Sequence, residues 1–144
     1  MGRTITIGTD SERFFRLYLE LLKAMPPLNQ LSNKDCNVLA EMMRRNAELS
    51  NSFKVKEDPK KWELVFASST RKEMRKVLGL TEASFNNSVS LLRKAGIIKG
   101  GGLSKAFVIY PSDVNKVTFE FRIEENGTEL QVREEQLEGA GEIE

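Results

Sequence analysis

The sequence predicts an α+β domain of about four helices, followed by a β-hairpin and an extra C-terminal strand. Four segments carry apolar residues at helical spacing, and two of these segments end at a single glycine. Short β-branched and alternating segments then follow, separated by a run of three glycines. A chain of 144 residues, of which 40% are hydrophobic, is long enough to bury one core.

We expect the chain to divide into three parts. Residues 1–10 are short, β-branched and glycine-containing, which is typical of an extended arm. Residues 11–123 make up the domain, whose first helices form an N-terminal extension. Residues 124–144 are acidic and contain glycine, so this C-terminal tail is expected to be partly disordered.

Two helices are predicted in the extension. The first runs from about Ser11 to Met25 and ends at two prolines. Its expected apolar face consists of Phe14, Leu17, Tyr18, Leu21 and Leu22. The second begins after Ser32, where "SNKD" resembles a capping box, and ends near Asn46. Its expected apolar stripe is Val38, Leu39, Met42 and Met43.

Residues 47–68 mix turn residues with apolar ones and predict a connecting loop with a short strand or two. Phe53 and Val55 alternate with polar neighbours, and "WELVF" is a short apolar run. The lysines of this region either extend a basic surface or keep an edge strand soluble; they are Lys54, Lys56, Lys60 and Lys61.

A second pair of helices is separated by a glycine turn. One helix spans roughly Thr70 to Leu78, with Ser69 or Thr70 as its cap. Gly79 follows it, at a position that favours left-handed backbone. Thr81 is expected to cap the next helix, which runs to Ala95 and ends at Gly96.

Three strands are expected after these helices. Two lie near residues 97–99 and 106–110 and are joined by "GGGLSK". The third lies at residues 117–123, where Val117, Phe119, Phe121 and Ile123 alternate with polar residues. An Asn126-Gly127 turn of the hairpin kind follows it.

Composition argues against an enzyme. The chain has no histidine and one cysteine, Cys36, so neither a zinc site nor a Ser-His or Cys-His nucleophile can be assembled. We therefore expect no catalytic residues, no metal and no cofactor. A signal peptide and a membrane span are also not expected, and a lone cysteine fits a reducing cytoplasm.

Charge is distributed unevenly along the chain. Residues 65–116 hold nine Lys or Arg against three acidic residues, whereas residues 117–144 hold two Arg against nine Glu. A basic middle suggests a polyanionic partner, and an acidic end suggests a solvated or regulatory tail.

The order helix, glycine turn, helix, glycine turn, strand, glycine loop, strand resembles the winged helix-turn-helix of DNA-binding proteins. The resemblance covers Ser69 to Pro111, in which "LGLT" is the turn and "LLRKAGII" leads into the wing. Phe85, Val89 and Leu92 form a stripe that packs inward, which leaves a polar face. Met74, Val77 and Leu78 of the preceding helix are also expected to face inward.

Candidate DNA contacts follow from this resemblance and from side-chain chemistry. Short amides and hydroxyls on the last helix suit base edges in a major groove: Ser84, Asn86, Asn87 and Ser90, with Ser88 on the same polar face. A solvated helix face is the alternative. Phosphate contacts are expected from Ser69, Thr70, Arg71, Lys72, Arg75, Lys76 and Lys94. The expected wing residues are Lys99, Gly100, Gly101, Gly102, Ser104 and Lys105, although the glycines also suit a plain hairpin turn.

Over residues 12–111 the chain also resembles RepL-type plasmid and phage replication initiators. The segments that carry the resemblance are "FFRLYLELLKAM", "LNQLSNKDCNVLAEMMRRN", the helix-turn-helix and "AFVIYPSD". The resemblance implies a plasmid- or phage-encoded protein of the bacterial cytoplasm that binds a replication origin or an operator, without catalysis.

The leading expectation is thus a sequence-specific double-stranded DNA-binding protein, in replication initiation or transcriptional regulation. The alternative is a winged-helix module for protein–protein interaction in a polymerase, a replisome or a phage assembly. A homodimer would suit two-fold DNA sites. Exposed parts of the first helix (Phe14, Phe15, Leu17 and Tyr18) or the C-terminal strand would provide its interface.

Overall fold

The computed structural model describes residues 2–123 of the chain. Over these residues the fold is α+β, with five α-helices and one antiparallel β-hairpin. The helices are α1 (Ser11–Leu22), α2 (Asn33–Ser50), α3 (Pro59–Val65), α4 (Ser68–Leu78) and α5 (Glu82–Lys94). The strands are β1 (Ile98–Lys99) and β2 (Gly102–Leu103), and short 3-10 turns lie at Leu28–Gln30 and Lys105–Phe107. None of the described helices combines the length and apolarity that a membrane span needs.

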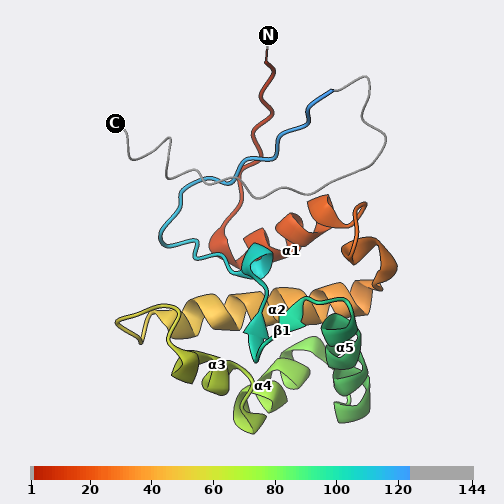
Figure 1. The fold of residues 1–144 in the computed structure, drawn as a ribbon, viewed down its shortest axis with the longest axis vertical. Helices are drawn as coiled ribbons and strands as arrows, with labels where there is room; N and C mark the ends of the chain where they lie inside the picture. The colour runs from red at the N-terminus through yellow and green to blue at the C-terminus, as the bar shows by residue number, and fades with distance from the viewer. Residues whose placement is uncertain (1, 124–144) are drawn as a thin grey trace.

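Helix α2 is the central element of the core. It crosses the middle of the molecule in Figure 1 and contacts α1, α3, α4 and α5. The predicted stripe of Val38, Leu39, Met42 and Met43 is confirmed, because each of these side chains is at most 1% exposed. The predicted capping box is also confirmed: Ser32 accepts from the backbone N–H of Asp35, whose carboxylate accepts from the backbone N–H of Ser32.

Helix α1 ends three residues earlier than predicted, and its buried face matches the predicted one only in part. Its buried residues are Phe15, Leu19 and Leu22, whereas Leu21 is 45% exposed. The prediction for Leu21 was therefore wrong. Two apolar stripes overlap in this segment, and contact with α2 selects the one that contains Phe15.

Residues 59–65 form helix α3 where the sequence suggested strands. Asp58 caps the helix by accepting from the backbone N–H of Lys60 at 2.9 Å, and Pro59 occupies the first helical turn. Val65 is fully buried. The Asp-Pro start and burial against α2 outweigh the β propensity of "WELVF".

Lys61 was predicted to be a surface or edge-strand lysine, yet its side chain is fully buried. Its Nζ donates to the Lys56 carbonyl at 2.5 Å and to the Tyr110 hydroxyl at 3.0 Å. It also lies 4.3 Å from the centroid of the Trp62 ring. Burial lowers the pKa of the Lys61 ammonium. Lys61 thus joins α3 to the loop before it and to the C-terminal part of the domain.

The hairpin is shorter than predicted. Ile98 pairs with Leu103 and Lys99 with Gly102, around a two-residue turn of Gly100 and Gly101. Both turn residues have positive φ, 60° and 82°, which side chains disfavour and which matches the twist of a tight hairpin. The strand expected at residues 106–110 is wrong, because the Lys105–Phe107 turn buries Phe107 in the core instead.

The strand expected at residues 117–123 is not formed either. This segment has no ladder partner within residues 2–123, and a strand needs one. Two apolar side chains at its end face solvent, with Phe121 90% and Ile123 98% exposed. The expected Asn126-Gly127 turn and the acidic tail lie outside the described residues.

Candidate nucleic-acid interface

Helices α4 and α5 are joined by a tight turn, as predicted. Gly79 ends α4 in the left-handed region, with φ 69°. The backbone N–H of Leu80 then donates to the Arg75 carbonyl at 2.9 Å. Thr81 caps α5 by accepting from the backbone N–H of Ser84 at 3.1 Å. Local hydrogen bonds therefore set the path of the chain between the two helices.

The start of α4 differs from the prediction. The helix begins at Ser68 after Ala67, which makes no side-chain cap, so neither Ser69 nor Thr70 is the cap residue. The Thr70 hydroxyl instead donates to the Leu64 carbonyl of α3 at 2.7 Å. Ser69 is exposed in the first turn of α4.

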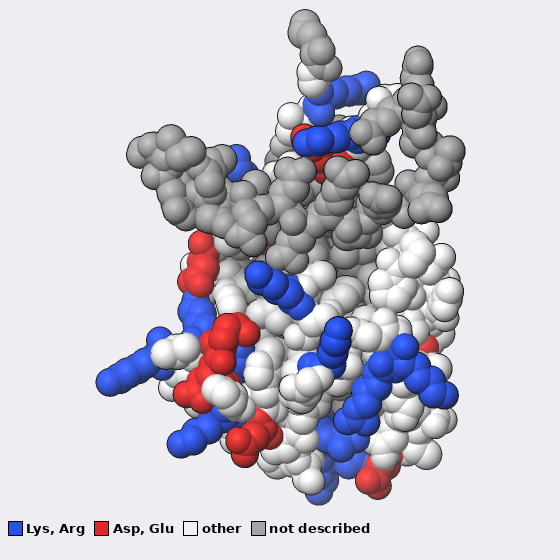
Figure 2. Space-filling model, in the orientation of Figure 1, with Lys and Arg blue, Asp and Glu red and all other residues white. Residues whose placement is uncertain are grey.

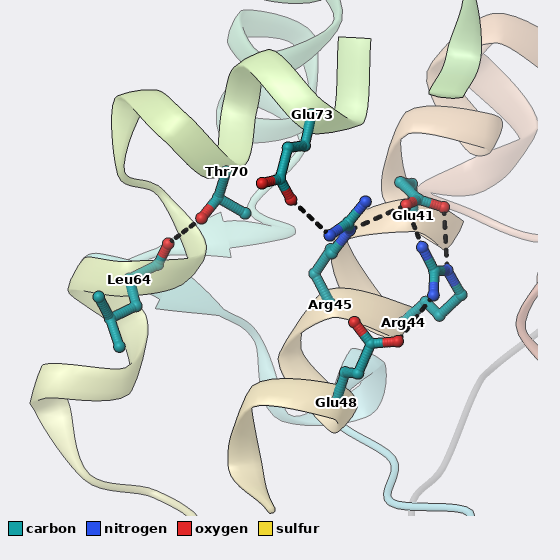
Figure 3. A network of polar contacts seen from close by, with 7 residues as sticks. All are labelled: Glu41, Arg44, Arg45, Glu48, Leu64, Thr70 and Glu73. Atoms are coloured by element: carbon teal, nitrogen blue, oxygen red, sulfur yellow. Dashed lines mark hydrogen bonds and ion pairs between the residues drawn. The ribbon is translucent and has the colours of Figure 1, made fainter. Parts of the chain in front are cut away.

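A polar network holds α4 against α2 (Figure 3). Arg45 of α2 donates to Glu41 at 3.1 Å and to Glu73 of α4 at 2.9 Å. Arg44 also binds Glu41, at 2.7 Å, and Glu41 is only 8% exposed. On its inner face α4 buries Met74 fully, but Val77 is 61% exposed. The inward placement predicted for Val77 was therefore wrong.

Helix α5 buries the predicted stripe of Phe85, Val89 and Leu92, each at most 2% exposed. Ser88 was expected on the polar face but is fully buried. It lies three residues after Phe85 and four before Leu92, which places it on the inner side of the helix. The Ser88 hydroxyl donates to the Asp35 carboxylate of α2 at 2.7 Å.

Asp35 of α2 is the acceptor of this hydrogen bond and links α2 to α5. Its burial, to 3% exposure, opposes ionisation, but hydrogen bonds from Ser88 and Ser32 outweigh this effect and lower the pKa of the carboxyl group. The anchored carboxylate holds α5 in a fixed rotation relative to α2.

Most of the predicted base-reading residues lie on the outer side of α5. Asn86, Asn87 and Ser90 are exposed, and Lys94 lies one turn beyond Ser90 on the same face. Ser84 differs from them because it is only half-exposed. Its hydroxyl and carbonyl oxygens accept from Nζ of Lys34 in α2, at 3.1 and 3.3 Å.

The predicted phosphate-binding residues of α4 fall into two groups. Lys72 and Lys76 are exposed. Arg71 and Arg75 are half-buried and directed to α5. Nη2 of Arg71 donates to Oδ1 of Asn86 at 2.5 Å, and Nη1 of Arg75 lies 3.8 Å from a Glu82 carboxylate oxygen. The two arginines therefore connect the helices as well as adding positive charge.

The predicted wing residues also occupy different environments. Lys99, Gly100, Gly101 and Lys105 are exposed, whereas Ser104 is half-buried. Gly102 is buried in β2, where a Cβ atom would lie 2.8 Å from Cε2 of Trp62. Gly102 thus allows close contact with α3 and is not part of the turn.

Arg93 is a basic residue that was not among the predicted DNA contacts. It is exposed on α5 and lines a shallow cleft of about 260 Å³. The other lining residues are Phe66, Ile98, Lys99, Gly100 and Gly101. Figure 2 shows Lys and Arg side chains gathered over the surface where α5 lies in Figure 1. The +6 charge of residues 65–116 was the signal that could have pointed to Arg93.

Comparisons with protein families, with curated proteins and with solved structures gave no match to this chain. The geometry of α4, α5 and the hairpin is compatible with a winged helix-turn-helix.

Proposed function

We propose that this protein is a winged helix-turn-helix protein that binds double-stranded DNA sequence-specifically, in replication initiation or transcriptional regulation. The observation that carries the proposal is the outer face of α5. Asn87, Ser90 and Lys94 are exposed on one side, while Phe85, Val89 and Leu92 hold the other side in the core. A helix that is fixed on one face and offers short polar groups on the other can enter a major groove.

The composition of this face supports base recognition. Asn and Ser are weaker helix formers than Glu, Lys or Gln, so solvation alone gives little reason to place them there. An Asn amide can bond adenine bidentately, and a Ser hydroxyl can donate or accept. Asn87 is exposed on this face and is the leading candidate for base reading.

Asn86 has a narrower role in this proposal. Its Oδ1 accepts from Arg71, which leaves the amide N–H groups to face the DNA. Asn86 then reads acceptors such as guanine O6 or thymine O4. Arg71 acts partly by orienting Asn86.

Phosphate contacts surround this face in the proposal. Lys72 and Lys76 lie on α4, Arg93 and Lys94 lie near the end of α5, and Lys99 lies on the hairpin. Cations of this kind position a protein on duplex DNA and supply affinity that does not depend on sequence. The Gly100-Gly101 turn beside Lys99 lets the hairpin backbone approach the duplex.

Selection from a random duplex pool tests the proposal directly. We expect an enriched sequence motif, together with an affinity that falls steeply between ~50 and ~200 mM salt as counterions are released. An unchanged affinity over this range, with no enriched motif, would contradict DNA binding. That outcome would favour the interaction module instead.

A further inference from the structure

We infer that two copies of this chain associate through the segment of residues 117–123, in which residues 119–123 pair antiparallel around a two-fold axis at Phe121. The segment lies outside any helix or turn, its apolar residues alternate with polar ones, and it has no ladder partner among residues 2–123. Such a segment offers unpaired backbone groups and an apolar face to a second strand. The inference does not depend on DNA binding.

Charge complementarity favours another copy of the same segment as the second strand. With the axis at Phe121, Glu120 of each copy lies opposite Arg122 of the other. Phe119 lies opposite Ile123 in the same register. The polar face then carries two pairs of opposite charges and the apolar face only aromatic and β-branched residues, which are the pairs that stabilise antiparallel sheets.

Within one chain, Arg122 binds Glu120 at 2.9 Å, and both side chains are more than half exposed. An exposed ion pair of this kind adds little stability.

Helix α1 supplies the surface on which the paired strands would lie. Phe119 is 5.7 Å from Tyr18 of α1, measured between ring centroids, and Tyr18 is 5.8 Å from Phe14. Residues on one face of a strand share its side, so in the paired strands Phe121 and Ile123 face the same way as Phe119. In the paired arrangement Ile123 lies beside the partner's Phe119 and near the partner's Tyr18. Pairing thus covers two apolar side chains that are 90% and 98% exposed in the single chain.

Figure 1 shows α1 and residues 111–123 at the end of the molecule opposite α5. The paired segments therefore leave the outer face of α5 uncovered in both copies. A two-fold dimer of this kind presents two copies of that face.

Charge reversal in the full-length chain tests the register, with light scattering after size exclusion as the measurement. The wild-type chain should have twice the 16.3 kDa mass of one chain. Glu120→Arg and Arg122→Glu each place like charges opposite one another, and each should raise the dimer dissociation constant about tenfold or more. Mixing the two variants should restore a dimer, because every charged pair is then opposite in sign.

Ser112→Arg is the matched control, since it adds a positive charge at an exposed position outside the paired segment. Its dimer should match the wild type. A one-chain mass for the wild-type protein at all accessible concentrations would overturn the inference. So would unchanged association of either single variant.

The main competing arrangement is a hairpin within the chain about Asn126-Gly127. That register places Glu120 opposite Arg133 and Arg122 opposite Gln131. In such a hairpin the charged residues pair within one chain, so mixing the two variants would not restore a dimer. A mixture that stays monomeric would therefore also overturn the two-fold pairing.

Discussion

The Ser88 hydroxyl of α5 donates to the Asp35 carboxylate of α2 at 2.7 Å, where the two residues are 0% and 3% exposed. These residues are 53 positions apart, and their hydrogen bond joins the buried faces of the two helices. It fixes the rotation of α5 about its own axis. That rotation decides which side chains of α5 face outward.

Ser88→Ala should destabilise the domain by about 1–3 kcal/mol, because a buried carboxylate loses a hydrogen-bond donor. Urea unfolding measures the change in free energy. Ser90→Ala is the matched control: Ser90 is exposed on the same helix, and its loss should change stability by less than about 0.5 kcal/mol. Equal effects from both substitutions would contradict the structural role of Ser88.

Stability should decrease in acid partly through Asp35. Its pKa in the folded chain is lowered from 3.8, so the ionised form stabilises the fold above that value. This contribution is lost as pH falls from the unfolded-state pKa through the lower folded-state pKa. Asp35→Asn removes it, so the acid part of the curve of unfolding free energy against pH should be flatter. An unchanged acid slope in Asp35→Asn would show that other carboxyl groups dominate.

Asn87→Ala should reduce discrimination at one base position by about 1–3 kcal/mol, while leaving the other positions of the motif unchanged. Competition binding with single-base variants of the selected duplex measures this. Lys72→Ala is the comparison, because Lys72 is exposed on α4. It should weaken binding to all sequences alike and reduce the salt slope by about one. The reverse pattern would mean that α5 does not read the bases.

Gly102→Ala should destabilise the domain by about 1–3 kcal/mol, because the new Cβ would lie 2.8 Å from the Trp62 ring. Thermal or urea unfolding provides the measurement. Gly8→Ala is the control, since nothing lies within 4 Å of a Cβ at that position. Wild-type stability in Gly102→Ala would show that β2 and Trp62 are not in close contact.

Several features set by short stretches of sequence were predicted correctly. The capping box at Ser32, the turn at Gly79 and the cap at Thr81 each depend on residues within a few positions of one another. The inner stripe of α5 followed from helical spacing. These signals were sufficient to locate α2, α4 and α5.

The features that were missed depend on distant residues. Ser88 can be buried because the Asp35 carboxylate, 53 positions away, accepts its hydrogen bond. Lys61 can be buried because the Tyr110 hydroxyl, 49 positions away, accepts a hydrogen bond from its Nζ. For α3 a local signal was present at Asp58-Pro59, but the apolar run after it suits a strand equally. Helical periodicity also could not choose between two faces of α1. In each of these cases tertiary contacts determine which residues are buried and which structure forms.

The complete burial of Lys61 has a consequence for proteolysis. A protease that cleaves after lysine must bind several residues around the bond in extended form. Lys61 lies within α3 with its side chain enclosed, whereas Lys54 is exposed in the loop before it. Cleavage after Lys61 therefore requires α3 to open, and its rate reports how often that part of the native protein unfolds locally.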